Sequence, residues 1–319
     1  MKTPLYRQAF SHSWHLAWKQ HSLWPLGLFA AMLGQMGLVD VLTQSWFTAR
    51  GYHPGEGWRL LFSLFNEGFS AGMVPASMFG WLAFLFTLFL GLGMFFLFVS
   101  VVSQGALVDV TARSVKRKKL HDIDKSWHVG VDHFWKVLLV NVLKKVMLML
   151  VGLSVAAAAV PLLFFSGGSS AFFLLVFIVA SLVGIVVSFL AVYTVGYIVI
   201  EEYSLLEAIV AAWHLFVEHW LVSIEVGFSL FLLNFVVMFL IVVGLFVSLI
   251  PAFFSYFFAL LFSSGTVFAF GIVISATVFL LVLFLIASVF SVFVVSTWTY
   301  LFMQMHKTGL KSHILHWLR

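Results

Sequence analysis

Histidine is the residue type in this sequence that most suggests chemistry, because there are 12 histidines in 319 residues and no cysteine. The lack of cysteine excludes disulfides, thiolate metal sites, iron–sulfur clusters and cysteine nucleophiles. A zinc site needs ligands that converge in space, and neither HExxH nor a comparable spacing occurs. We therefore predict histidines in solvent or at a lipid interface, with no metal and no cofactor. The alternative is a histidine cluster that binds a metal or senses pH, because imidazole titrates near neutrality.

Several of these histidines belong to a repeated Trp-His motif. The octapeptide from Ser126 to His133 (SWHVGVDH) matches the one from Ala212 to His219 (AWHLFVEH), 86 residues later. A third copy begins at Ser13 and has Lys19 where the other two have an acid. In those two copies the histidine and the acid are four apart, a spacing at which they can share a hydrogen bond on a helix surface. The tryptophans would anchor a short helix at the level of the lipid headgroups. The residues singled out are Trp14, His15, Trp127, His128, Asp132, Trp213, His214 and Glu218.

A second group of candidates consists of polar side chains inside apolar segments. Ionisable groups in hydrocarbon are costly and usually face a bundle interior or a wet cavity. The group expected to line a polar cavity in the cytoplasmic half is Glu225, Gln104, Asn141, Lys144, Lys145 and Asp109. A structural role is the alternative for several of them. Asp109 is four residues before Arg113 and can pair with it. Glu225 can pair with Lys144 or Lys145 of a neighbouring helix as a clamp.

The basic run Lys116, Arg117, Lys118 and Lys119 is predicted to fix the orientation of the chain and to contact anionic lipid. Each charge near such a surface is worth about 1 kcal/mol. This interpretation replaces nucleic-acid binding as the explanation of the net charge of +5. The sequence has no GxSxG, P-loop, dinucleotide fingerprint or paired carboxylates in a polar segment, so we do not expect an enzyme.

The elements that must position these residues are membrane-spanning helices. The chain is 63% hydrophobic and 9% charged, with a mean hydropathy of +1.11, whereas a soluble domain has about a quarter of its residues charged. A helix needs about 20 apolar residues to cross the bilayer. We predict an all-α integral membrane protein with about six spans: Leu23–Phe47, Phe79–Ala112, Phe134–Phe165, Ala171–Ile200, Trp220–Leu249 and Val267–Met303.

The distribution of basic residues predicts the orientation of these spans. Of the 17 Lys and Arg residues, 15 lie near the N-terminus, near the C-terminus or around the loop between the second and third spans. Cytoplasmic loops carry the basic excess, so both termini are expected in the cytoplasm, in a bacterial inner membrane. The sizeable outer segment, residues 44–78, contains apolar residues at helical spacing over residues 56–70. We expect an amphipathic helix there, on the outer leaflet.

The position of the Trp-His motif before each odd-numbered span divides the chain into three tandem units. Their approximate limits are residues 5–112, 120–200 and 204–305. Each unit would be an interfacial helix, an outward span and an inward span, so all three have the same orientation. Repeats of this kind are related by an axis along the membrane normal, which predicts a single transmembrane domain with pseudo-threefold symmetry.

Two features of the sequence carry a family resemblance. One is the opening Trp18-Lys19-Gln20-His21-Ser22-Leu23-Trp24-Pro25-Leu26-Gly27. The other is the pattern in which a span ends and is followed by Ser204-Leu205-Leu206-Glu207-Ala208 and a Trp-bearing elbow. The chain resembles bacterial inner-membrane proteins of the glycerophosphoryl diester phosphodiesterase membrane-domain and YciC-like kind. The resemblance implies a six-helix membrane domain, which some relatives join to a soluble phosphodiesterase barrel. It implies no catalytic residue in this chain.

These observations predict a non-enzymatic membrane protein that organises or binds lipid or a membrane partner. The expected partners are membrane lipids, other membrane proteins or further copies of the chain. A channel or transporter for a small solute or ion, using the polar cavity, is the alternative. A lipid-modifying enzyme is a third hypothesis, and it requires histidines and acids clustered at headgroup level.

Overall fold

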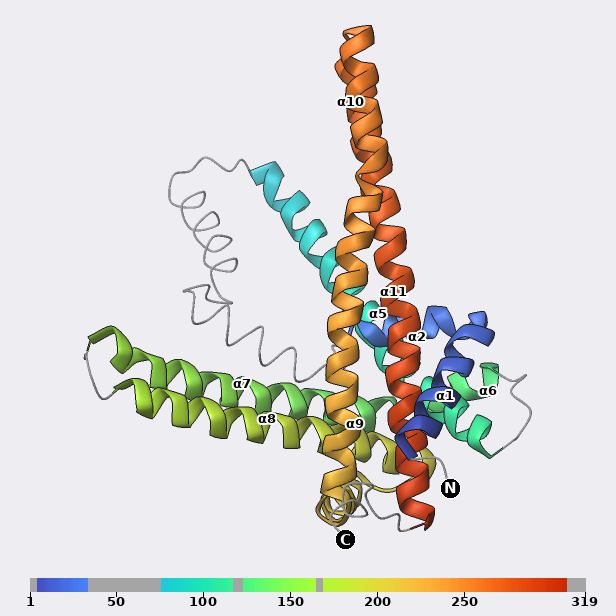
Figure 1. The fold of residues 1–319 in the computed structure, drawn as a ribbon, viewed down its shortest axis with the longest axis vertical. Helices are drawn as coiled ribbons and strands as arrows, with labels where there is room; N and C mark the ends of the chain where they lie inside the picture. Colours follow the sequence, from blue (N-terminus) through green and yellow to red (C-terminus); the bar gives the residue numbers. More distant parts are fainter. Residues whose placement is uncertain (1–4, 34–75, 117–122, 165–168, 309–319) are drawn as a thin grey trace. The chain divides into compact units, whose positions relative to one another are not determined.

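The computed structural model describes residues 5–33, 76–116, 123–164 and 169–308, and these residues form helices joined by turns (Figure 1). In chain order the helices are α1 (Leu5–Lys19), the 3-10 turn η1 (His21–Leu23), α2 (Trp24–Ala31), α5 (Ala76–Val115), α6 (Ile123–Asp132), α7 (Phe134–Phe164), α8 (Ser169–Ile200), α9 (Leu205–Ser248), α10 (Ile250–Phe262) and α11 (Gly265–Thr308). The predicted all-α fold is confirmed for the described residues.

Five helical stretches are long and apolar enough to cross a membrane, so the chain is a multi-pass membrane protein. They are Ala83–Val115, Phe134–Ala159, Ala171–Ile200, Leu205–Phe262 and Gly265–His306. The count of six spans is not confirmed. The first predicted span, Leu23–Phe47, begins with α2 but continues beyond the described residues. The predicted amphipathic segment 56–70 also lies outside the described residues.

The structure extends the predicted fifth span, Trp220–Leu249, to a continuous candidate span of Leu205–Phe262, with a kink at His219 directly before Trp220. Helix α9 begins before the span, where the side chain of Glu207 accepts hydrogen bonds from the amide (3.1 Å) and hydroxyl (2.7 Å) of Ser204. After the turn residue Leu249 a second helix, α10, begins at Ile250, and Pro251 stands in its first turn, where a missing N–H is tolerated. It ends at Ser263, whose φ of 49° breaks the helical repeat.

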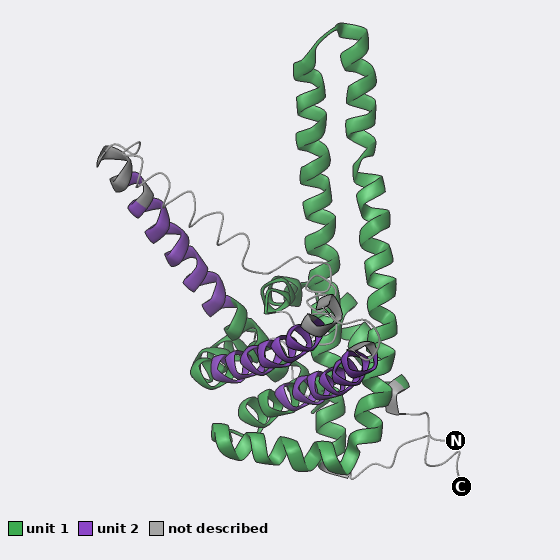
Figure 2. Cartoon of the chain, turned by 90° about the vertical axis from the view of Figure 1, so that its left-hand side faces the viewer, with its two compact units in different colours: residues 1–35, 100–137, 192–319 green, residues 36–99, 138–191 purple. Residues whose placement is uncertain are grey.

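The chain divides into two compact units (Figure 2). Unit 1 comprises residues 1–35, 100–137 and 192–319, and unit 2 comprises residues 36–99 and 138–191. In unit 1, α11 packs along α9, α10, α1 and α2. The inner, C-terminal parts of α5, α8 and α11 are buried on nearly every side. Their fully buried side chains include Leu107, Tyr193, Ile198 and Leu301, so the core of unit 1 lies at these three helix ends.

Glycine allows two of the helix crossings in unit 1. A Cβ on Gly130 of α6 would collide with the carbonyl oxygen of Val102 in α5, and one on Gly105 would lie 3.1 Å from the Cα of Gly130. A Cβ on Gly27 of α2 would collide with the backbone of Ser288 in α11. Close backbone approach through small residues is typical of helices that pack in lipid, where apolar burial does not drive association.

Unit 2 contains the hairpin of α7 and the outer part of α8. Its small core consists of Val151, Val155 and Ala180, with Phe173 and Phe177 packed against it. Beside this core the two helices form an open groove of about 360 Å³, lined by apolar residues and Ser154. Many large apolar side chains of α7 and α8 are exposed, as expected for helices in contact with lipid.

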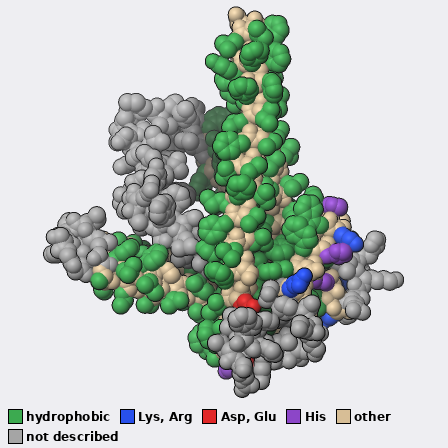
Figure 3. Space-filling view, in the orientation of Figure 1, with side chains coloured by type: hydrophobic (Ala, Val, Ile, Leu, Met, Phe, Trp, Pro, Cys, Tyr) green, Lys and Arg blue, Asp and Glu red, His purple; other side chains and the backbone are tan. Residues whose placement is uncertain are grey.

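The surface of unit 1 has two different regions (Figure 3). Hydrophobic side chains cover the hairpin formed by α9, α10 and α11 along its length, and no residue of α10 is buried. Lys, Arg and His side chains gather over α1 and its neighbours. Helix α1, which carries the first Trp-His motif, therefore belongs to the polar region of this unit.

Candidate functional site

The three copies of the Trp-His motif form helical elbows ahead of longer helices, and they are called the elbows below: Ser13–His21 in α1 and η1, Ser126–His133 in α6, and Ala212–His219 in α9. The first residue of each elbow is fully buried: Ser13, Ser126 and Ala212 are at most 1% exposed. Each elbow therefore turns the same edge toward the protein.

The Trp and His that follow lie on the outer side of each elbow. The side chains of Trp14 and Trp213 are 54% and 50% exposed, and Trp127 is half-buried. The histidines that follow them are exposed in all three copies: His15, His128 and His214. Because neighbouring helical residues point about 100° apart, burial of the first residue places the next two outward. The repeated sequence thus corresponds to a repeated orientation.

The structure gives two of these histidines a partner other than the predicted acid. Nδ1 of His128 lies 2.7 Å from the carbonyl oxygen of Asp124, and Nδ1 of His214 lies 2.9 Å from that of Val210. A carbonyl accepts only, so Nδ1 is the donor and Nε2 is the acceptor in the neutral ring. The acids that we expected to pair with them, Asp132 and Glu218, lie one turn ahead. The two rings are held on the backbone one turn behind.

The end of the second and third elbows falls at the same motif position. His133 separates α6 from α7, and His219 has non-helical φ and ψ of −122° and 27° within α9. The imidazole of His219 is 6% exposed, and its Nδ1 finds no hydrogen-bond partner among the described residues. The carbonyl oxygen of His219 accepts a hydrogen bond from the hydroxyl of Ser223. The same hydroxyl lies 2.7 Å from that of Tyr193 on α8. These contacts fix where the elbow meets the longer helix.

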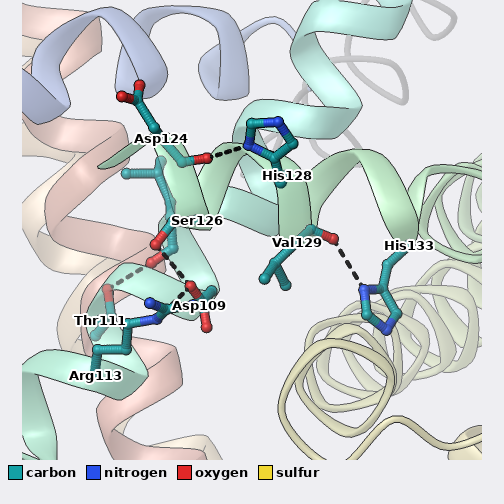
Figure 4. Close-up of polar contacts among 9 residues, drawn as sticks. Asp109, Thr111, Arg113, Asp124, Ser126, His128, Val129 and His133 are labelled. Carbon is teal, nitrogen blue, oxygen red and sulfur yellow. Dashed lines mark hydrogen bonds and ion pairs between the residues drawn. The ribbon is translucent and has the colours of Figure 1, made fainter. Parts of the chain in front are cut away.

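Asp109 of α5 joins α5 to the second elbow (Figure 4). Its Oδ2 lies 2.7 Å from Nε of Arg113 and accepts a hydrogen bond of 2.6 Å from the Ser126 hydroxyl. Thr111, also on α5, has its hydroxyl oxygen 3.1 Å from that of Ser296 on α11. The predicted pair of Asp109 with Arg113 is confirmed. Asp109 therefore has a structural role in holding α6, which the sequence spacing alone did not show.

Gln104 is the cavity candidate that lies at a junction of helices in unit 1. It lines a small cleft with residues of α8 and α11, among them Gly196, Trp298 and Thr299. The cleft has a volume of only about 20 Å³, enough for about one water molecule. In this conformation, the inner ends of α5, α8 and α11 pack against one another with little space between them.

The other cavity candidates lie on different helices. Asn141 and Lys144 are buried and Lys145 is exposed, all on the part of α7 that belongs to unit 2. Glu225 is half-buried on α9, in unit 1. The predicted pair of Glu225 with a lysine of α7 therefore stays a prediction. Of the basic run, Lys116 follows α5 and is exposed, whereas Arg117, Lys118 and Lys119 lie outside the described residues.

Sequence reasoning missed an aromatic cluster at the inner ends of α8 and α11. The ring of Tyr197 packs edge-on against Phe302 and His306, with centroid distances of 4.8 and 5.6 Å, and stacks on Tyr203 at 5.4 Å. Nε2 of His306 is 3.8 Å from a carboxylate oxygen of Glu201. Phe302 and His306 are four apart, which places them on one helix face, but nothing local shows that Tyr197 faces them.

Within the described residues, no group of three His, Asp or Glu side chains converges in a way that could hold a metal ion. The arrangement offers three outward Trp-His pairs at the elbows, one ion pair inside the α5–α6 contact and a packed aromatic cluster. No family model, curated protein or solved structure matches this chain.

Proposed function

We propose that this chain is a non-enzymatic, multi-pass protein of a bacterial inner membrane that binds or organises lipid through its elbows. The observation that supports this function is the repeated outward orientation of the Trp-His pair. An exposed tryptophan at the end of a membrane helix is most stable at headgroup level, where its ring contacts apolar chains and its N–H contacts water. The exposed Trp14 and Trp213 and the half-buried Trp127, each ahead of an apolar stretch, would contact lipid headgroups.

Several further observations agree with this function. The imidazoles of His128 and His214 are tied to the backbone through Nδ1, so Nε2 is left as the atom that can meet a headgroup. The transport alternative requires a polar path along the helices. The cleft beside Gln104 is about 20 Å³, which supports close packing at this junction of α5, α8 and α11.

Lipid retention tests this function. The full chain and the variant Trp14→Ala/Trp127→Ala/Trp213→Ala are purified in mild detergent, and bound phospholipids are counted by native mass spectrometry. We expect the variant to retain fewer lipids, because it loses the rings that would hold them. A matched control is Trp81→Ala, which removes an exposed tryptophan of α5 that belongs to no elbow. Equal retention in the triple variant and the wild type would refute the proposal.

The alternative function has its own measurement. Solute or ion flux into liposomes that rises with the purified protein and vanishes in Glu225→Gln would establish transport. Flux that does not exceed that of empty liposomes is the result we expect.

A further inference from the structure

The elbows share an orientation but differ in charge. The first elbow helix, α1, carries Arg7 and Lys19 and has no acid. The second, α6, carries Asp124 and Asp132 with Lys125. The third elbow contains the acid Glu218, with Glu207 earlier on the same helix, and α9 has no Lys or Arg. A headgroup with a negative charge would therefore be attracted by the first elbow and repelled by the third.

The charges of α1 lie on the face that its packing leaves free. Ala9, Ser13, Leu16 and Ala17 are buried, and α1 packs against α11. The opposite face exposes the basic residues together with the aromatic side chains. Its exposed residues are Arg7, Gln8, Ser11, Trp14, His15, Trp18 and Lys19. We call these seven residues the α1 face. Arg7 and Lys19 lie at the two ends of this face, and Trp14 and Trp18 lie between them.

The tryptophans of the α1 face are held in place by other rings. Trp14 packs edge-on against Phe293 of α11 at a centroid distance of 6.2 Å, and Trp14 and Trp18 are 5.6 Å apart. Trp18 contacts Trp24 of α2 at 6.3 Å, and Nε1 of Trp24 donates a 2.8 Å hydrogen bond to the carbonyl of Ala17. Trp14 and Trp18 remain 54% and 44% exposed. Their positions are set before any ligand binds, which reduces the entropy lost on binding.

From this combination we infer that the α1 face binds the headgroups of anionic phospholipids. The inference rests on the proposed function and identifies the class of lipid. Tryptophans favour the headgroup level, and Arg and Lys beside them meet the phosphate and its net charge. An acidic protein segment would satisfy the charges, but it would leave the exposed indole rings without the mixed apolar and polar surroundings that they prefer. The acid-free helix and the ordered tryptophans together favour a lipid surface.

The experiment compares phosphatidylglycerol with phosphatidylcholine. The full chain in nanodiscs that contain equal amounts of both lipids is extracted into detergent, and the ratio of retained lipids is measured by mass spectrometry. We expect the wild type to prefer phosphatidylglycerol, and Arg7→Gln/Lys19→Gln to reduce that preference by up to about 30-fold. The variant Arg7→Lys/Lys19→Arg keeps both charges and should keep the preference. Added salt should weaken the wild-type preference, because exposed charges are screened.

A matched control removes the same charge elsewhere. Lys125→Gln/Lys136→Gln takes two cations from α6 and α7, and we expect it to keep most of the preference. An equal loss in both double variants would show an effect of net charge and overturn the inference. The inference would also be overturned if the Arg7→Gln/Lys19→Gln variant kept the full lipid preference but no longer bound a polyglutamate peptide that the wild type binds. That result would show that the α1 face binds an acidic protein.

Failure of this inference can be told from failure of the proposed function. If the total number of retained lipids depends on Trp14, Trp127 and Trp213 but the wild type shows no preference between the two headgroups, only the inference fails. If the triple tryptophan variant retains all its lipids, the proposed function fails whatever the ratio.

Discussion

At the scale of single residues, the best-defined polar contacts in the described chain are structural. Asp109 accepts a hydrogen bond from Ser126, which holds α6 on α5, and its ion pair with Arg113 lies within α5. His12 has a comparable place between three helices. Its Nε2 is 3.2 Å from the Ser114 hydroxyl of α5, and its ring lies 5.2 Å from that of Tyr300 in α11. Burial, with a smaller contribution from the charge of His15, lowers the pKa of His12 below its ordinary value.

This lowered pKa predicts a stability that depends on pH. Above about pH 6.5, the ordinary histidine pKa, His12 is neutral in both the folded and the unfolded chain, and its packing stabilises the fold fully. As the pH falls from there through the lower pKa of the folded state, the unfolded chain binds the proton first and stability decreases. We expect the melting temperature to fall between about pH 7 and pH 5, and to fall less in His12→Asn. The control His128→Asn, on an exposed ring, should keep the wild-type slope. An unchanged slope in His12→Asn would contradict the prediction.

At the scale of helices, close approach between backbones sets two of the crossings in unit 1. The crossing of α5 and α6 depends on Gly105 and Gly130, since each helix leaves space for the other where a side chain would stand. The elbows also end at defined points, at His133 and His219, where the helix direction is set by local backbone geometry. An elbow can hold its Trp-His pair outward only while its inner edge stays packed.

The crossing gives a prediction for Gly130. A Cβ at this position meets the carbonyl of Val102, and that backbone cannot move without disturbing α5. We expect Gly130→Ala to lower the free energy of unfolding by about 1–3 kcal/mol. The matched control is Gly93→Ala, where a Cβ has no atom within 4 Å and alanine is the better helix former. Thermal unfolding in detergent measures both. A Gly130→Ala variant as stable as Gly93→Ala would show that the two helices do not pack this closely.

At the scale of the whole chain, helix length is in excess of what a bilayer needs. Helix α11 has 44 residues, so it is about 66 Å long, whereas the hydrocarbon core is about 30 Å thick. The hairpin of α9, α10 and α11 must therefore tilt strongly or extend past the core. Its turn at Ser263 lies opposite the elbows along the hairpin, which predicts that the two ends are on different sides of the membrane.

Single-cysteine labelling tests this topology directly, because the natural chain has no cysteine and each variant carries one thiol. We expect Ser263→Cys to react with an impermeant maleimide on intact spheroplasts. Lys116→Cys and Glu202→Cys should react only after the membrane is opened, because their loops follow inward helices. All three positions are exposed in the structure. Labelling of Glu202→Cys on intact spheroplasts would overturn the predicted orientation.

The sequence by itself determined the class of protein and the ends of several helices, whereas the count of six spans and the threefold arrangement stay predictions. The start of α7 at Phe134 and the end of α8 at Ile200 were predicted correctly, because apolar length and helix breaks are local properties. Tertiary structure alone decided which faces pack. In a membrane protein, lipid-facing and core-facing side chains are both apolar, so hydropathy does not distinguish them. The bond from Ser126 to Asp109, the packing of Tyr197 on Phe302 and the extension of the α9 span through α10 therefore had to come from the structure.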